Sequence, residues 1–143
     1  MIKLKRQLIE DFIINGIMTD KNTILIVDDE PVVIKLTKKF LELGDFTIIT
    51  CNSGNAAMET LEKHYNEIGM VLLDIMMPGK SGYSVLKEIK ANEEYDHIQV
   101  ILFSVKSFTE DMDKGRALGA DGYITKPFSG TDLIKYIKER LNK

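Results

Sequence analysis

The sequence predicts a doubly wound α/β fold, in which helices cover both faces of a five-stranded parallel sheet. From Thr23 onward, short runs rich in Ile, Val and Leu alternate with longer segments of helical apolar spacing. Such short apolar runs are typical of strands that are buried on both faces, and strict alternation with helices favours right-handed crossovers in a parallel sheet. Four of the runs also end in polar residues, at Asp28-Asp29, Asp74, Ser104 and Lys126.

The five strands and five helices can be placed in order along the chain. We expect strands at residues 23–27, 46–51, 70–73, 99–103 and 121–125. The helices after them begin at residues with the usual N-terminal signals, namely Pro31, Asn52 or Ser53, the end of the loop 77–82, Ser107 or Thr109, and Ser129 or Thr131. Glycines are expected to follow three of the helices: Gly44, Gly69 and Gly119.

Each helix carries an apolar face that should pack on the sheet. For the first helix we expect this face to consist of Val32, Val33, Leu36, Phe40, Leu41 and Leu43. The second and third helices should direct Ala56, Ala57, Met58 and Leu61, and then Val85, Leu86 and Ile89, toward the core. For the last two helices the apolar residues are Phe108, Met112, Ala117 and Leu118, and then Leu133, Ile134, Ile137 and Leu141.

Composition restricts the class of protein. A chain of 143 residues suits one domain with a real core, and its 29% charged and 44% hydrophobic residues are ordinary for a soluble protein. A formal net charge of −3 argues against nucleic acid as a partner, because that binding depends on cations that neutralise phosphates. No apolar stretch is long enough to span a membrane. The single Cys51 fits a reducing cytoplasm and should be buried filler.

Residues 1–20 precede the first strand and have no place in the alternating pattern. Leu4, Leu8 and Phe12 could line one face of a short helix, together with Ile9 and Ile13. Asn15-Gly16 would end it, and Glu10 and Asp11 argue against a signal peptide. Met18 also stands directly before the domain at 21–143. We therefore expect either an upstream start or mobile extension, or a helix that docks on the domain or on a partner.

The polar residues at the strand ends indicate phosphoryl chemistry. Ligands of open α/β sheets bind beyond the carboxyl ends of the strands, so the fold should bring these residues together. Asp74 is the expected nucleophile, since a carboxylate can attack a phosphoryl group. Its charge and that of Asp28 and Asp29 would repel a phosphoryl group, and a Mg²⁺ ion bound by these carboxylates would remove the obstacle. Lys126 and Ser104 can contact the phosphoryl oxygens.

Taken singly, each of these pieces has an ordinary structural explanation. An Asp-Asp-Glu triplet can simply oppose a helix dipole, and a Lys-Pro pair can be only a turn. Their joint pattern is more specific. Residues 24–30, 72–82, 102–104 and 119–128 resemble the receiver domain of two-component response regulators, and the resemblance covers residues 22 to 143.

The resemblance implies a flavodoxin-like sheet of strand order 2-1-3-4-5 and a role for each site residue. Asp74 matches the phosphoacceptor, and Asp28 and Asp29 match the acidic pair that holds Mg²⁺. The backbone carbonyl of Met76 matches the remaining protein ligand of the metal. Lys126 matches the family's lysine, with a cis bond to Pro127. Ser104 and Tyr123 match the hydroxyl and the aromatic residue that switch together.

The family also implies partners and an activity. We expect a stand-alone switch in the cytoplasm that is not an enzyme in its own right and that resembles the single-domain chemotaxis-type regulators. A histidine kinase or phosphotransfer protein would phosphorylate Asp74, and the face from Phe108 to Leu141 would bind a downstream protein. Val105 is bulkier than the small residue usual in the family and could narrow access to the site. Met76 and Lys106 occupy positions that tune how long the phosphoryl group lasts.

Three other functions remain as alternatives. A phosphorylation-independent interaction module is favoured slightly by Val105 and opposed by the intact charged residues. An FMN-binding electron carrier has the same topology, but Asp28-Asp29-Glu30 would repel the cofactor's phosphate. A hydrolase would need a second acid two residues after Asp74, and none is present. His64 and His97 have no companion ligands in the sequence, so we do not interpret them as metal ligands.

Overall fold

The computed structural model of the protein describes residues 22–105 and 109–141. Its elements are, in order, β1 (Thr23–Val27), α2 (Pro31–Leu43), β2 (Thr47–Cys51), α3 (Gly54–His64), β3 (Ile68–Leu73), α4 (Gly82–Ala91), the short 3₁₀ helix η2 (Glu93–Tyr95), β4 (Gln99–Ser104), α5 (Thr109–Ala117), β5 (Gly122–Thr125) and α6 (Gly130–Leu141). The expected N-terminal extension, Lys106, Ser107 and Phe108 lie outside the described residues.

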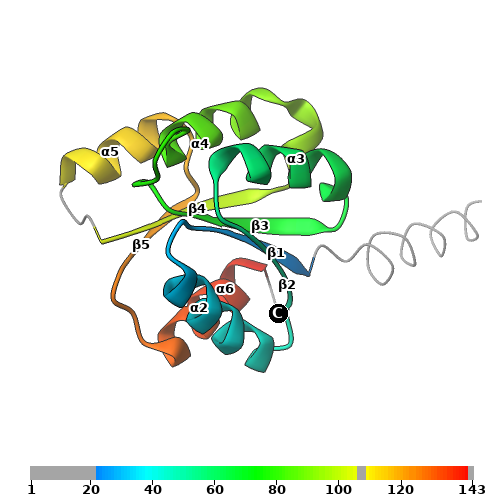
Figure 1. Ribbon diagram of the computed structural model, residues 1–143, viewed down its shortest axis with the longest axis vertical. Coiled ribbons are helices and arrows are strands. Elements are labelled where there is room, and N and C mark those ends of the chain that lie inside the picture. The colour runs from blue at the N-terminus through cyan, green and yellow to red at the C-terminus, as the bar shows by residue number, and fades with distance from the viewer. Residues whose placement is uncertain (1–21, 106–108, 142–143) are drawn as a thin grey trace, which may run out of the picture.

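The five strands form one parallel sheet in the order β2-β1-β3-β4-β5, which confirms the predicted doubly wound fold. Figure 1 shows α2 and α6 on one face of the sheet and α3, α4 and α5 on the other. Every residue of β1 and β3 is buried, as expected of strands that are covered on both faces. Among the helices of the described ranges, none has the length and apolar character that crossing a membrane requires.

Local signals in the sequence explain most helix ends. Pro31 occupies the first turn of α2, where its missing N–H leaves no broken bond. The Ser53 hydroxyl accepts a hydrogen bond from the Ala56 amide (3.1 Å), and the Ser129 hydroxyl accepts one from the Asp132 amide (3.0 Å). Both serines therefore cap helices, as predicted.

The expected boundary at Gly69 is wrong. Helix α3 already ends at His64, and Gly69 lies inside β3. The strand begins at Ile68 because its pairing with β1 extends back to Thr23, and both Ile68 and Met70 are fully buried. Tertiary pairing thus decides a position that the glycine alone suggested would end a helix.

Two helices bury fewer apolar side chains than expected. In α2 only Thr37 and Leu41 are buried, whereas Val32, Leu36 and Leu43 are exposed. The apolar residues extend around more of the helix than one sheet face can cover, and Thr37 takes an inward position instead. In α5, of which Thr109–Ala117 are described, the buried residue is Gly115. The expected faces of the other helices are confirmed, with Ala57, Leu61, Val85, Leu86, Ile89, Leu133 and Ile137 buried and Ala56, Met58, Ile134 and Leu141 packed against the core.

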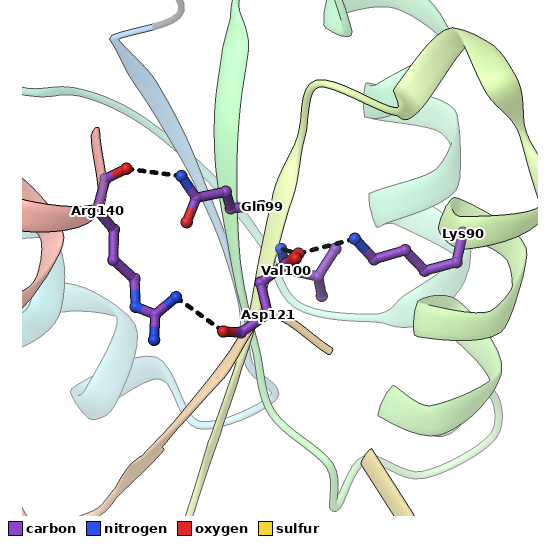
Figure 2. Close-up of polar contacts among 5 residues, drawn as sticks. All are labelled: Lys90, Gln99, Val100, Asp121 and Arg140. Atoms are coloured by element: carbon purple, nitrogen blue, oxygen red, sulfur yellow. Dashed lines mark hydrogen bonds and ion pairs between the residues drawn. The ribbon is translucent and has the colours of Figure 1, made fainter. Parts of the chain in front are cut away.

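A polar network joins four elements at the end of the sheet where β4 and β5 begin (Figure 2). One carboxylate oxygen of Asp121 accepts hydrogen bonds from the Lys90 ammonium (2.7 Å) and the Val100 amide (2.8 Å). The Arg140 guanidinium donates to the Asp121 carbonyl (2.7 Å), and the Gln99 amide donates to the Arg140 carbonyl (2.7 Å). Asp121 therefore links α4, β4 and α6 directly before β5.

Replacing Asp121 tests the contribution of this network. We expect Asp121→Ala to lower the free energy of unfolding by about 1–3 kcal/mol, because the buried amide of Val100 loses its side-chain acceptor. Asp121→Asn keeps an oxygen acceptor and loses only the half-exposed ion pair with Lys90, so its loss should be below about 1 kcal/mol. Urea denaturation of both variants measures the difference, and equal losses would contradict this account.

Candidate functional site

The carboxyl ends of the strands bring the predicted site residues to one edge of the sheet. In the pairing of β1 with β3, Val27 lies opposite Leu73, so the residues that follow these two strands leave the sheet side by side. The Asp74 amide donates a hydrogen bond to the Val27 carbonyl (2.9 Å), which continues this pairing. In the same way, the Lys126 amide donates to the Ser104 carbonyl (2.8 Å) beyond the pairing of β4 with β5.

Three carboxylates meet at this edge. Asp28, Asp29 and Asp74 each place a carboxylate oxygen within 4.8 Å of the others. Asp28 and Asp74 are buried and Asp29 is half-buried, because successive side chains of an extended chain point to opposite sides. Hard oxygen donors of this kind are the ligands that Mg²⁺ prefers, so these residues fit a divalent cation.

Lys126 supplies the positive charge inside this cluster. Its ammonium lies 2.5 Å from a carboxylate oxygen of Asp28 and 3.8 Å from one of Asp74. The side chain is only 8% exposed, and its ammonium sits 4.8 Å from the centre of the Phe103 ring. The following peptide bond to Pro127 is cis, as predicted. One cation therefore faces three carboxylates, and the cluster remains short of positive charge.

The environment of Asp74 shifts its ionisation. Burial is the largest cause and raises the pKa of its carboxyl from 3.8 to about 6. The Lys126 ammonium opposes this rise, and the Asp28 carboxylate adds to it. Asp74 is therefore only partly protonated at neutral pH and is ready to ionise fully when positive charge is added.

The chain after Asp74 is held close to it. The Met76 amide donates a hydrogen bond to the Asp74 carboxylate (3.2 Å), while the Met76 side chain is 54% exposed. Gly82, the first residue of α4, packs against the Asp74 backbone so closely that a Cβ atom would lie 2.1 Å from the Asp74 carbonyl oxygen. From the sequence alone, we expected Gly82 only as the last residue of the loop before α4. The sequence feature that could have indicated this close packing is a glycine directly before an apolar helical segment.

Ser104 and Tyr123 interact on the other side of the site. Ser104 is fully buried and Tyr123 is half-buried. Burial raises the pKa of the Tyr123 hydroxyl, Asp111 adds to the rise, and a hydrogen bond with Ser104 opposes it. The two residues that the family resemblance paired are therefore in contact, and Asp74 is close enough to influence Tyr123 as well.

The remaining residues of interest lie around or away from this edge. Val105 follows β4 and is 64% exposed. Cys51 is buried against Thr60, and burial raises the pKa of its thiol, consistent with a filler role. His64 ends α3 beside Glu67, and a ring nitrogen of His97 lies 2.7 Å from the Tyr65 carbonyl oxygen.

A doubly wound domain with an acidic cluster and a buried lysine at the carboxyl edge of its sheet has the architecture of a signalling receiver. The comparison with protein families agrees, because the model of the response regulator receiver domain matches residues 24–138. The chain belongs to this family. This identification confirms the resemblance seen in the sequence.

Two curated relatives are regulatory proteins that are longer than the matched region. The regulatory protein VanR of Enterococcus faecium is 36% identical over 126 residues, which is 88% of this chain and 52% of VanR. The transcriptional regulatory protein CpxR of Escherichia coli K12 is 34% identical over 122 residues, or 85% of this chain and 50% of CpxR. The chain thus spans about half the length of the curated relatives it matches.

Solved structures agree with the fold. The BeF3-activated receiver domain of DrrB aligns with a TM-score of 0.75 and 30% identity, covering 85% of this chain and 97% of that domain. Chemotaxis protein CheY4 of Vibrio cholerae aligns with a TM-score of 0.77 over 82% of this chain and 96% of CheY4. Its identity is 22%, so it supports the fold alone.

Removing the charge of Asp74 should stabilise the fold at neutral pH. The pKa of Asp74 in the folded protein is raised above its ordinary value of 3.8, so the unfolded chain loses this proton at a lower pH than the folded protein. The free energy of unfolding therefore falls as the pH rises from about 4 to about 6. Without added metal, Asp74→Asn should therefore raise the free energy of unfolding by about 1–3 kcal/mol at pH 7.

That gain should shrink steeply by pH 4 and vanish below about pH 3, where Asp74 is protonated in both states and resembles the neutral amide. Urea denaturation at pH 4, 6 and 7 in the presence of a chelator measures the trend. A gain that does not change with pH would contradict the raised pKa of Asp74.

Proposed function

We propose that the protein is a phosphorylation switch whose Asp74 accepts a phosphoryl group from a histidine kinase or phosphotransfer protein in a Mg²⁺-dependent reaction. The observation that carries the proposal is the cluster of Asp28, Asp29 and Asp74, in which the Lys126 ammonium pairs with Asp28 and lies close to Asp74. Membership of the receiver family supports it. In this proposal, Asp28, Asp29, Asp74 and the backbone carbonyl of Met76 hold the metal.

The chemistry follows from the side chains present. An ionised oxygen of Asp74 attacks the phosphorus atom, a new O–P bond forms an acyl phosphate, and the bond from phosphorus to the donor's imidazole nitrogen breaks. The leaving imidazole keeps the bonding electron pair and takes up a proton. A bound Mg²⁺ ion would offset the negative charge of the phosphoryl oxygens and the carboxylates. No enzyme activity is proposed beyond this self-directed transfer and the later attack of water on the acyl phosphate, which releases inorganic phosphate and restores the Asp74 carboxylate.

Lys126 and Ser104 would then contact the transferred group. Lys126 is bound mainly to Asp28 and lies farther from Asp74, so a phosphoryl group on Asp74 would offer its ammonium a second anionic partner. Ser104 can donate its hydroxyl hydrogen to another phosphoryl oxygen. Because Tyr123 contacts Ser104, a movement of the serine would reach the tyrosine.

The signal would be read out on the face that contains α5, β5 and α6. A hollow of about 390 Å³ opens there, with Tyr123 in its lining. Arg116, Tyr136 and Arg140 also line it, which gives a protein partner both aromatic and charged contacts. This hollow lies within the face from Phe108 to Leu141 that the sequence analysis assigned to a downstream protein. That the chain acts without an attached output domain stays a prediction.

The first test measures phosphorylation by mass. We expect the intact protein to gain one phosphoryl mass after incubation with acetyl phosphate and Mg²⁺, because a small acyl phosphate can replace the protein donor. Asp74→Asn should abolish the gain, whereas the exposed Asp96→Asn should leave it unchanged. If the native protein gains no mass, the phosphorylation-independent interaction module becomes the better function.

The second test measures the coupling from Ser104 to Tyr123. Beryllofluoride, a tetrahedral mimic of the phosphoryl group, should shift the NMR amide signals of Asp28, Asp74 and the lining of the hollow. In Ser104→Ala the shifts around Asp74 should persist and those of Gly122 and Tyr123 should fall at least about twofold, since the contact between the two side chains is lost.

The exposed Ser84→Ala on α4 is the matched control and should behave like the native protein. Equal shifts at Tyr123 in Ser104→Ala and in the native protein would show that the signal takes another route.

A further inference from the structure

Helix α2 presents an apolar stripe to solvent. Val32, Leu36 and Leu43 are 78%, 49% and 74% exposed, and they account for three of the five large apolar side chains that are exposed in the described residues. Their spacing of four and seven residues puts them on one side of the helix, and the exposed Lys39 lies on the same side between Leu36 and Leu43. These three side chains are exposed in the described residues 22–105 and 109–141, and apolar side chains that gather on one exposed helix side can mark a contact.

The chain enters the domain beside one end of this stripe. The Asn22 side-chain amide donates a hydrogen bond to the Asp45 carbonyl (3.0 Å), and the Thr47 amide donates to the Asn22 carbonyl (3.3 Å). Asp45 lies two residues beyond Leu43, the last residue of α2. Asn22, where the described chain begins, therefore lies at the C-terminal end of α2.

The sequence of the preceding segment, residues 1–21, matches the stripe in pattern and length. Leu4, Leu8 and Phe12 are spaced by four residues, as are Val32 and Leu36. Residues 2–14 would form a helix about 20 Å long at 1.5 Å per residue, and α2 has the same thirteen residues. Asn15-Gly16 and the residues up to 21 supply a connection that can turn the chain back.

The charges along the two segments also match. If the segment runs back from Asn22 along α2, its start lies near the start of α2. The segment carries cations first and carboxylates later, at Lys3, Lys5, Arg6, Glu10 and Asp11. Near α2 the order is first reversed, with carboxylates at Asp29 and Glu30 and exposed cations at Lys35, Lys38 and Lys39, and the exposed carboxylates Glu42 and Asp45 follow at its C-terminal end. The clearest matches along the two segments are Lys3 with Glu30, and Glu10 with Lys39.

We propose that residues 2–14 form an amphipathic helix that docks along the Val32, Leu36 and Leu43 stripe of α2 in the same chain. The docked helix would place its basic start at the rim of the carboxylate cluster, because α2 begins directly after Glu30. It would thereby cover the side of α2 next to the site. This inference does not depend on Asp74 being phosphorylated, and a chain starting at Met18 would lack the cover.

Hydrogen exchange of the full chain tests the proposal. An isolated helix of this length is marginal in water, so slow exchange of residues 4–14 would report docking. We expect these amides to exchange at least about tenfold more slowly than in an unstructured chain. Leu36→Glu should remove this protection and leave that of β1 and β3 unchanged. Leu8→Glu, which alters only the segment, should do the same.

Val105→Glu is the matched control, because it replaces another exposed apolar side chain away from α2 and should keep the protection. Fast exchange of residues 4–14 in the native chain would overturn the proposal, as would protection that survives Leu36→Glu. Protection that appears only at high protein concentration, together with a doubled mass, would also overturn it, since a second copy would then be the occupant of the stripe.

Discussion

The placement of one ammonium among three carboxylates governs the chemistry of this protein. Lys126 pairs with the fully buried Asp28 and lies within ion-pair distance of Asp74. Without this cation, two carboxylates could not remain together in a buried site. Even with the Lys126 ammonium present, the cluster carries more negative than positive charge. The raised pKa of Asp74 reflects its burial and the nearby carboxylate charge of Asp28. A divalent cation and a phosphoryl group are together the kind of ligand that such a cluster can accept.

The fold produces this cluster through the geometry of a parallel sheet. All five strands run in the same direction, so the polar residues that end them meet at one edge even though Asp28 and Lys126 are far apart in sequence. The carboxylates leave β1 and β3, at the centre of the sheet, where the chain order reverses and ligands of such folds bind. Ser104 and Tyr123 extend the site toward β5. At the opposite end of β5, the hydrogen bonds of Asp121 join the chain to α4, β4 and α6.

Much of this arrangement could be predicted from local sequence. Buried parallel strands read as short apolar runs, so the positions of Asp74, Ser104 and Lys126 followed from where those runs end. The Lys126–Asp28 ion pair and the close packing of Gly82 on Asp74 could not be foreseen, because they depend on distances between separate elements. The apolar face of α2 was overestimated for a related reason. Apolar spacing identifies an amphipathic helix but does not say how much of its surface a neighbour covers, and here Leu36 and Leu43 remain uncovered.

The most direct test of this account is calorimetric titration of the native protein with Mg²⁺ at pH 6 in buffers of different ionisation enthalpy. If the cation binds at the carboxylate cluster, it must displace the proton that Asp74 holds with a pKa of about 6. The account predicts release of about half a proton for each ion bound, and almost none in Asp74→Asn. Absence of Mg²⁺ binding, or binding with the same proton release in both proteins, would contradict it.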